Sequence, residues 1–279
     1  MKLLVKDVVK SFTTGDRVVD TLDNITIKVE KGEFVTIVGP SGCGKSTLLS
    51  IIAGLEKPTS GKIYVDGREV NGPGPDRLVM FQESALFPWF NVLQNVEFGL
   101  KIAGMNKHSR REIARHYLKM VYLSRFETAY IHQLSGGMKQ RVALARALAL
   151  NPDILLMDEP FAALDSQTRS LLHAELQAIW EETGKTIVFV THNVEEAVSL
   201  ADRVVVFSSR PGRIKKEFRI QLSRPRNLEM ADLGRTVTRV MEELKTEVEK
   251  VVKEELDSDW ASAESTLLYS AGCRMGSGL

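Results

Sequence analysis

The sequence predicts an α/β fold built on a mostly parallel β-sheet. Three apolar runs, at 34–38, 154–157 and 186–190, have the Val, Ile, Leu and Phe content of strands that a parallel sheet buries on both faces. Helical patterns at 45–55 and 166–182 follow the first two runs, and this alternation of strand and helix is typical of parallel sheets. Because no run of about 18 apolar residues occurs, the sequence predicts no transmembrane helix.

The other segments are expected to add strands and helices around this sheet. A turn near Gly15 separates two strand patterns, and Asp66-Gly67 is a two-residue hairpin turn. The elements expected here are strands at 3–12, 23–33 and 77–81, a hairpin over 61–70, and helices over 107–123 and 135–150.

Composition allows a full-sized core and excludes several classes of function. The 279 residues carry 37 Lys and Arg against 36 Asp and Glu, a formal net charge of +1, so nothing favours general nucleic-acid binding. Charged residues near the N-terminus argue against a secretory peptide, and we expect a cytosolic protein. The distant pair Cys43 and Cys273 suggests neither a disulfide framework nor a metal site. The spacing of His108, His116, His132 and His173 is not that of metal ligands, and we expect them at surface or helix positions.

A phosphate-binding loop is predicted between the run at 34–38 and the helix after it. The sequence there matches G-x-x-x-x-G-K-[ST] in full, in the strand-to-helix context that the motif requires. Its alternative, a Gly-rich turn, is strongly disfavoured. Lys45 is expected to reach the β- and γ-phosphates, Ser46 to bind Mg²⁺, and Thr47 to lie by the α-phosphate. The predicted nucleotide-binding residues of the loop are Gly39, Pro40, Ser41, Gly42, Cys43, Gly44, Lys45, Ser46 and Thr47. Cys43 is expected to contribute only its backbone N–H, although a reactive thiol is conceivable there.

Two carboxylates end the run at 154–157. Asp158 is placed beside the phosphate loop by the parallel topology and suits Mg²⁺, which prefers oxygen ligands. Glu159 points the other way and is expected to act as the base for the water that attacks the γ-phosphate. A solvated turn is the alternative.

A third motif, Leu134-Ser-Gly-Gly-Met-Lys-Gln-Arg141, opens the helix expected at 135–150. Ser and two Gly at a helix N-terminus suit an anion, and a second anion site makes sense if two copies of the chain pair. Here the sequence resembles the ATP-binding subunits of ABC transporters over about residues 1–215. The resemblance implies that Ser135, Gly136 and Gly137 bind the γ-phosphate held by the partner subunit. It also implies a P-loop NTPase fold with a RecA-like sheet core, an antiparallel β subdomain, a helical signature subdomain and, in this chain, an added C-terminal helix.

Other residues fit the family's motifs in order along the chain. Phe12 stands where an aromatic ring stacks on adenine, with a core aromatic as the alternative. Gln82 fits the loop that contacts Mg²⁺ and water, with a solvated loop residue as the alternative. The segment 163–165 matches the family's D-loop and contains Asp165. His192 matches the switch histidine, and the alternative is a histidine at a strand end whose hydrogen bonds are satisfied locally. The catalytic set implied by the resemblance is Lys45, Gln82, Glu159 and His192, and the metal set is Ser46, Gln82 and Asp158.

The implied mechanism needs two chains, membrane partners and ATP with Mg²⁺. ATP closes a head-to-tail homodimer, hydrolysis opens it, and these movements drive membrane permease subunits at the cytoplasmic face of a bacterial membrane. The segment 86–90 is either local core or part of the groove that receives the permease, and it resembles the nitrate, sulfonate and taurine importer branch. An extracytoplasmic solute-binding protein would act indirectly. The alternative is a soluble ABC ATPase of DNA repair or translation, which no basic stripe or long insertion favours.

The predicted domains are an ATP-binding domain at 1–222, with a helical subdomain at about 84–150, a C-terminal amphipathic helix at 223–256, and a flexible tail at 257–279. Apolar residues spaced three and four apart predict the helix. It either lies on its own domain or serves in self-pairing or regulation.

Overall fold

A six-stranded sheet in the order β10-β9-β3-β8-β7-β6 forms the centre of the computed structural model, which describes residues 1–15, 17–162, 164–224, 226 and 231–272. The pairs β9/β3, β3/β8, β8/β7 and β7/β6 are parallel, and only β10 pairs antiparallel. The prediction of a mostly parallel sheet is confirmed. The strands are β3 (Phe34–Val38), β6 (Arg77–Met80), β7 (Ile154–Asp158), β8 (Thr186–Thr191), β9 (Arg203–Phe207) and β10 (Ile214–Arg219).

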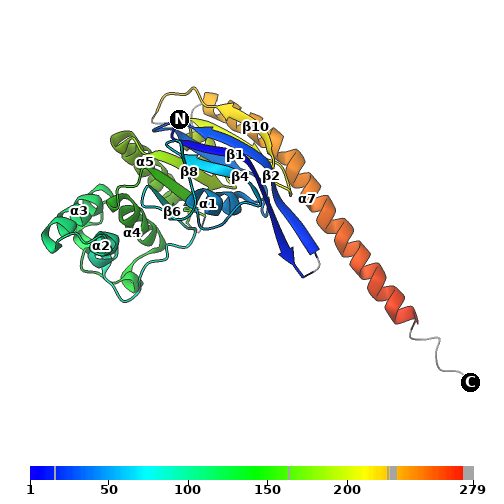
Figure 1. Cartoon of the computed structure of the whole chain (residues 1–279), viewed down its shortest axis with the longest axis horizontal. Helices are drawn as coiled ribbons and strands as arrows, with labels where there is room; N and C mark the ends of the chain where they lie inside the picture. Colours follow the sequence, from blue (N-terminus) through cyan, green and yellow to red (C-terminus); the bar gives the residue numbers. More distant parts are fainter. Residues whose placement is uncertain (16, 163, 225, 227–230, 273–279) are drawn as a thin grey trace, which may run out of the picture.

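A second, antiparallel sheet has the order β2-β1-β4-β5, and its long β1/β2 hairpin projects from the body of the molecule (Figure 1). Its strands are β1 (Leu3–Thr14), β2 (Arg17–Val29), β4 (Ser60–Val65) and β5 (Arg68–Glu69). Asp66 and Gly67 both have positive φ, the conformation of a two-residue hairpin turn, and this predicted hairpin is confirmed.

Three helices, α2 (Val92–Ile102), α3 (Lys107–Met120) and α4 (Gly136–Ala149), pack together at one end of the molecule (Figure 1). Helix α2 was not predicted. Its start carries a capping box, in which Asn91 accepts from the Gln94 N–H and Gln94 accepts from the Asn91 N–H. Helix α3 ends three residues before the predicted end at 123.

The other helices complete the chain. They are α1 (Lys45–Ala53), α5 (Ser166–Thr183), α6 (Val194–Leu200), α7 (Ala231–Gly272) and the short 3₁₀ turns Ser124–Phe126 and Ile131–Gln133.

Two apolar layers cover the two faces of the six-stranded sheet. Along β3, Val35 and Ile37 face a layer formed with α1 and the antiparallel sheet, whereas Phe34 and Val38 face a layer formed with α4 to α7. This alternation is the period of a strand, and all five β3 residues are buried. The sheet is therefore fixed from both sides, and its strand ends have defined positions.

Helix α7 lies along the edge of the body and continues beyond it (Figure 1). Its first turns pack on the domain through the buried side chains Leu233, Val237 and Val240. The helix continues to Gly272, beyond the predicted helix end at 256, and the predicted flexible tail over 257–279 stays a prediction. Residues 273–279 lie outside the described residues, as does Cys273.

Candidate nucleotide-binding site

The strands β3, β7 and β8 end at one edge of the sheet. At this edge the β1/β2 hairpin and the segments that follow β3, β6, β7 and β9 line a cavity of about 690 Å³. This volume is in the usual range of small-molecule sites. The cavity is lined by Phe12, Val19, Thr21, Ser41, Gly42, Gly44, Lys45, Ser46, Thr47, Gln82, Asp158, Glu159 and Arg210.

The predicted phosphate loop connects β3 to α1. Gly42 and Gly44 have positive φ values of 75° and 96°, which other residues rarely adopt. The Lys45 ammonium, almost completely buried, donates to the carbonyl oxygens of Gly39 and Pro40 at 2.9 Å each. The loop thus surrounds the Lys45 ammonium with its own carbonyl groups, and the N-terminus of α1 lines the cavity.

Cys43 lies in the same loop with an exposed fraction of only 1%. Burial raises the pKa of its thiol, and the nearby Lys45 opposes this only in part. A thiol with a raised pKa is a poor nucleophile at neutral pH, so the structure favours the expectation that Cys43 contributes only its backbone.

Asp158 ends β7 next to the phosphate loop, where the Ser46 hydroxyl donates to its Oδ1 at 3.0 Å. Burial raises the pKa of Asp158, and the charge of Glu159 adds to this, whereas the Ser46 hydrogen bond and Lys45 lower it. Two oxygen ligands therefore meet at the point where the sequence predicted Mg²⁺, and their hard oxygen atoms fit that ion.

Glu159 and His192 form the second polar pair at this edge. The Glu159 Oε2 lies 2.8 Å from His192 Nδ1, at the ends of the adjacent strands β7 and β8. Glu159 has φ of 44°, and its N–H donates to the carbonyl of Val190. A non-Gly residue in the left-handed region stores strain, which is common at functional sites.

Phe12 and Gln82 also reach the cavity. Phe12, from the β1/β2 hairpin, is 38% exposed, and the Lys10 ammonium lies 4.6 Å from its ring centroid. It is not a core aromatic, and an exposed ring beside a cavity can stack on a base. The backbone carbonyl of Gln82 accepts a hydrogen bond from Gln140 Nε2 at 3.0 Å, which ties the loop after β6 to α4.

The third motif is not among the residues that line this cavity. Ser135 caps α4 by accepting from the Met138 N–H, and Ser135 and Gly136 are exposed. Asp165 similarly caps α5, and the N–H of Thr168 lowers its pKa. Within one chain these residues form a separate exposed surface. Ala163 of the predicted D-loop lies outside the described residues.

Three lining residues were not predicted: Val19, Thr21 and Arg210. Val19 pairs with the predicted Phe12 across the hairpin, so cross-strand pairing could have indicated it, and Thr21 lies two residues further along the same strand. Arg210 follows β9, about 170 residues after the phosphate loop in sequence, and no local pattern marks it.

The described residues outside the cavity hold neither a cluster of metal ligands nor a membrane-spanning helix. His173 Nε2 lies 2.7 Å from Glu196 Oε1, between α5 and α6. In the described part of the chain, no group of three or more His, Cys, Asp or Glu side chains is arranged to hold a metal ion. No described helix combines the length and apolar character needed to cross a membrane.

The predicted docking segment 86–90 borders a groove of about 300 Å³ between the loop after β6 and helices α2 and α4. The rings of Phe87, Phe90 and Phe98 pack together, whereas Trp89 is 67% exposed. Arg146 donates to the carbonyls of Ala85 and Ser84, which fixes the groove wall. The segment is thus part local core and part exposed apolar surface.

A phosphate loop after β3, with a strand-end carboxylate on the parallel strand β7 on the other side of β8, defines the class of P-loop nucleotide-binding proteins. The family model described as ABC transporter matches residues 22–162, and the chain belongs to this family as an ATP-binding subunit.

Relatives cover most of the chain. An uncharacterized ABC transporter ATP-binding protein of Methanocaldococcus jannaschii is 54% identical over 253 residues, 91% of this chain and 95% of the relative. Since α7 begins at Ala231, this match extends into α7. The nitrate import ATP-binding protein NrtD of Synechocystis is 54% identical over 80% of this chain and 84% of its own. The taurine import ATP-binding protein TauB of Burkholderia pseudomallei is 47% identical over 80% and 86%.

A solved structure agrees with this fold. A dimeric ATP-binding cassette in a post-hydrolysis state, bound to ADP and Pi, has a TM-score of 0.71 and 38% identity. It covers 79% of this chain and all of its own. The predicted P-loop NTPase fold is confirmed.

Proposed function

We propose that this chain is the ATP-hydrolysing, energy-coupling subunit of an importer for a small anionic solute such as nitrate, a sulfonate or taurine. The observation that carries the proposal is the division of the site: the phosphate loop, Asp158 and Glu159 share one cavity, whereas Ser135 and Gly136 are exposed elsewhere. Such a chain holds ATP alone but needs a second copy to enclose it.

In the proposed reaction, a water molecule attacks the γ-phosphate and Glu159 accepts its proton. The water oxygen bonds to the γ-phosphorus as the bond to the β-phosphate oxygen breaks, and ADP leaves. His192, at 2.8 Å from Glu159, orients this carboxylate and reaches toward the γ-phosphate. Lys45 neutralises the phosphates once it exchanges its two carbonyl partners for them.

Mg²⁺ would be held by Ser46 and Asp158, which already meet at 3.0 Å, and by Gln82. When bound, the ion would neutralise negative charge on the phosphates. Phe12 would stack on the adenine, and backbone N–H groups from Gly39 to Thr47 would surround the phosphates.

The second copy would bring its own Ser135, Gly136 and Gly137 to the γ-phosphate, with Asp165 nearby in the head-to-tail dimer. The similar cassette that forms a dimer with ADP and Pi bound supports the pairing of two copies. ATP would close the dimer, and loss of phosphate would open it.

The importer role rests on relatives and on the groove. NrtD and TauB are named for nitrate and taurine import. The groove beside Phe87 and the exposed Trp89 offer an apolar surface for a permease subunit, so the chain would act at the cytoplasmic face of the membrane, with a solute-binding protein on the other side. No observation favours DNA repair or translation.

Substitution of the proposed base tests the reaction. Glu159→Gln is expected to lower ATP turnover about 100-fold or more, because the water loses its proton acceptor, while ATP binding persists. Phosphate release measures turnover, and light scattering with ATP measures dimerisation, which this variant is expected to prolong.

The exposed Glu83 of the neighbouring loop supplies the control, since Glu83→Gln is expected to hydrolyse ATP like the wild type. Wild-type turnover in Glu159→Gln would exclude Glu159 as the base. Transport of radiolabelled nitrate or taurine by vesicles holding the chain with its permease would test the importer role separately.

A further inference from the structure

The loop 208–213, between β9 and β10, lies directly against the phosphate loop. The Arg210 guanidinium donates through Nε and Nη2 to the Gly42 carbonyl at 3.3 and 3.2 Å. Two residues later, the N–H of Gly212 donates to the Thr21 carbonyl at 2.9 Å. A Cβ at Gly212 would lie 2.1 Å from the carbonyl oxygen of Cys43, so only glycine permits this approach. The loop 208–213 thus packs closely against the phosphate loop and forms one side of the nucleotide site.

Among the described residues, Arg210 and Lys45 are the two cations that line the cavity. The two carboxylates Asp158 and Glu159 line it as well, so the described lining alone has no excess of positive charge. A triphosphate brings several negative charges. Arg210 holds Gly42 with only one edge of its guanidinium, and its Nη1 makes no hydrogen bond to any residue in the described ranges. The free edge of a guanidinium suits phosphate oxygens.

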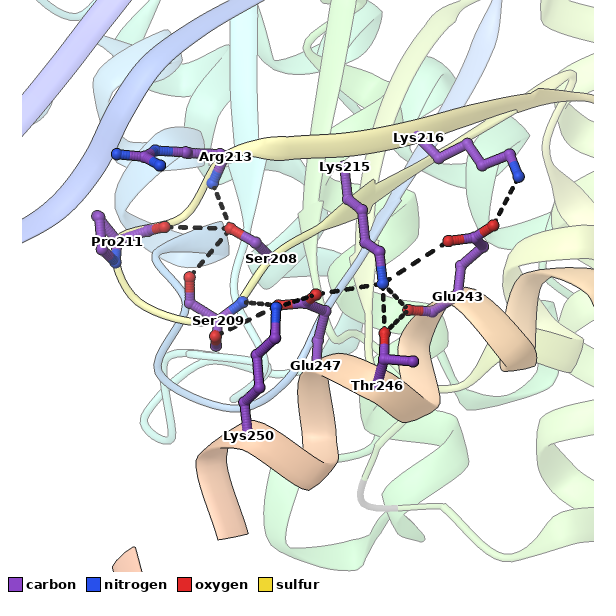
Figure 2. Close-up of polar contacts among 10 residues, drawn as sticks. All are labelled: Ser208, Ser209, Pro211, Arg213, Lys215, Lys216, Glu243, Thr246, Glu247 and Lys250. Atoms are coloured by element: carbon purple, nitrogen blue, oxygen red, sulfur yellow. Dashed lines mark hydrogen bonds and ion pairs between the residues drawn. The ribbon is translucent and has the colours of Figure 1, made fainter. Parts of the chain in front are cut away.

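Helix α7 fixes the residue that precedes Arg210. The Glu247 Oε2 accepts from the Ser209 N–H at 3.0 Å and from its hydroxyl at 3.3 Å (Figure 2). Its Oε1 pairs with Lys250 at 2.9 Å and with Lys215 of β10 at 3.2 Å (Figure 2). Glu247 is only 2% exposed, and a buried carboxylate with this many partners has a defined position.

The far side of the loop is held too. The Ser208 hydroxyl accepts from the Arg213 N–H at 3.0 Å and lies within hydrogen-bond distance of the carbonyls of Ser209 and Pro211 (Figure 2). Arg213 pairs with Asp23 through its side chain. Since both ends of the loop are anchored, Arg210 is held at the cavity in a defined position, and Glu247 is the anchor that the described side chains of α7 contribute.

We propose that Arg210 is a nucleotide-binding residue that contacts the phosphates of ATP, and that Glu247 of α7 positions it. The inference rests on the proposed function, because it deepens the description of the same site. It gives α7 a defined role: the helix reaches the nucleotide through two residues, Ser209 and Arg210, without entering the cavity itself. Damage to α7 near Glu247 then weakens ATP binding and leaves the chemical step intact.

The first experiment measures the equilibrium affinity for ATP with Mg²⁺ by isothermal titration calorimetry. Arg210→Gln is expected to weaken binding about tenfold, because a charge-assisted hydrogen bond to phosphate is lost. Arg210→Lys keeps the positive charge but loses the paired N–H donors of the guanidinium, so this variant is expected to recover part of the affinity for ATP. The matched control is Arg219→Gln, which removes an exposed arginine of β10 and is expected to bind ATP like the wild type.

Salt dependence separates a phosphate contact from mere support of Gly42. If Arg210 contacts phosphate, the affinity of Arg210→Gln for ATP falls less steeply with salt than that of the wild type. A purely structural role would weaken binding without changing this slope. Unchanged affinity in Arg210→Gln, an unchanged slope, or no recovery in Arg210→Lys would each overturn the phosphate contact.

A double-mutant cycle tests the part assigned to Glu247. Glu247→Gln is expected to raise the KM for ATP about threefold with kcat unchanged, because it releases the loop but touches no reacting atom. In the Arg210→Gln background the same substitution is expected to add nothing, since Glu247 acts through Arg210. If the effects of Glu247→Gln and Arg210→Gln on the KM for ATP were additive, Glu247 would not act through Arg210. The exposed Glu249 supplies the control, Glu249→Gln, and circular dichroism verifies that every variant is folded.

The two proposals fail in different ways. If the wild type itself bound no ATP, the proposed function would be wrong and the variants would have no meaning. If the wild type bound ATP and Arg210→Gln bound it equally well, only the role of Arg210 would be wrong.

Discussion

In the parallel sheet, β3 and β8 are buried along their whole length, whereas α7 buries one apolar face over its first ten residues and is then held by ion pairs. Beyond Val240, Leu244 is only partly buried against the core, and the polar contacts of α7 include Glu243 with Lys216 and Glu247 with Lys215 and Ser209. Apolar burial fixes the strand ends that carry Asp158, Glu159 and His192. Ion pairs at a partly exposed edge are weaker and depend on pH and salt. The sheet therefore fixes the strand-end residues Asp158, Glu159 and His192, and in our proposal α7 supports ATP binding from outside the sheet.

The largest effect is expected from a cavity in the sheet layer. Phe189 of β8 is fully buried, with ring centroids 5.9 Å from Phe34 and 6.0 Å from Phe161. Phe189→Ala is expected to lower the free energy of unfolding by about 3–5 kcal/mol, because buried apolar contacts are lost and a cavity remains. Urea unfolding followed by fluorescence measures the change. Phe126→Ala, at a residue 43% exposed, is the control and is expected to differ little. Equal effects would contradict the assignment of stability to the sheet.

An intermediate effect is expected where α7 meets the domain. Leu233 is fully buried, and Leu233→Ala is expected to weaken the docking of α7 by about 2–5 kcal/mol. If the two regions are held separately, hydrogen exchange speeds up in α7 while the amides of β3 and β8 remain protected. Met241→Ala, at a residue 48% exposed, should change neither. Parallel loss of protection in the sheet would mean that α7 and the sheet unfold as one unit.

The smallest effect concerns pH. Burial alone would raise the pKa of Glu247, but hydrogen bonds from Lys250, Ser209 and Lys215 lower it to about 2, from an ordinary value of 4.5. Because the folded pKa is the lower one, the stabilising contribution of Glu247 is complete above about pH 4.5 and is lost as the pH falls toward 2. The difference in unfolding free energy between wild type and Glu247→Gln should therefore shrink between pH 5 and pH 3, measured by urea unfolding.

The other charged groups at this contact are Glu243 on α7 and Lys216 on β10, and the latter lowers the pKa of Glu243. Glu249→Gln keeps this cluster and serves as the control. A constant difference across that pH range would show that the ion pairs contribute nothing to the docking of α7.

Local sequence patterns predicted the sheet and most of the cavity lining. The reason is that each motif directly follows an apolar run, and an apolar run of this length is itself a signal for a buried strand. Helix α2 was missed since its residues follow an aromatic-rich stretch that masked the helical period, although Asn91 and Gln94 formed a readable capping box. Arg210 could not be predicted in this way. It reaches Gly42 only because β9 pairs beside β3, a contact between distant parts of the sequence that carries no local signal.

The position of Ser135 and Gly136 outside the cavity has a genetic consequence. In the proposed dimer each catalytic unit is assembled from two different molecules, with the phosphate loop from one and the Ser135 segment from the other. A chain damaged only in its phosphate loop and a chain damaged only at Ser135 would each be inactive, yet a mixed pair contains one undamaged unit. Two defective alleles of this gene, expressed together, would therefore complement one another in part, whereas two alleles damaged in the same segment would not.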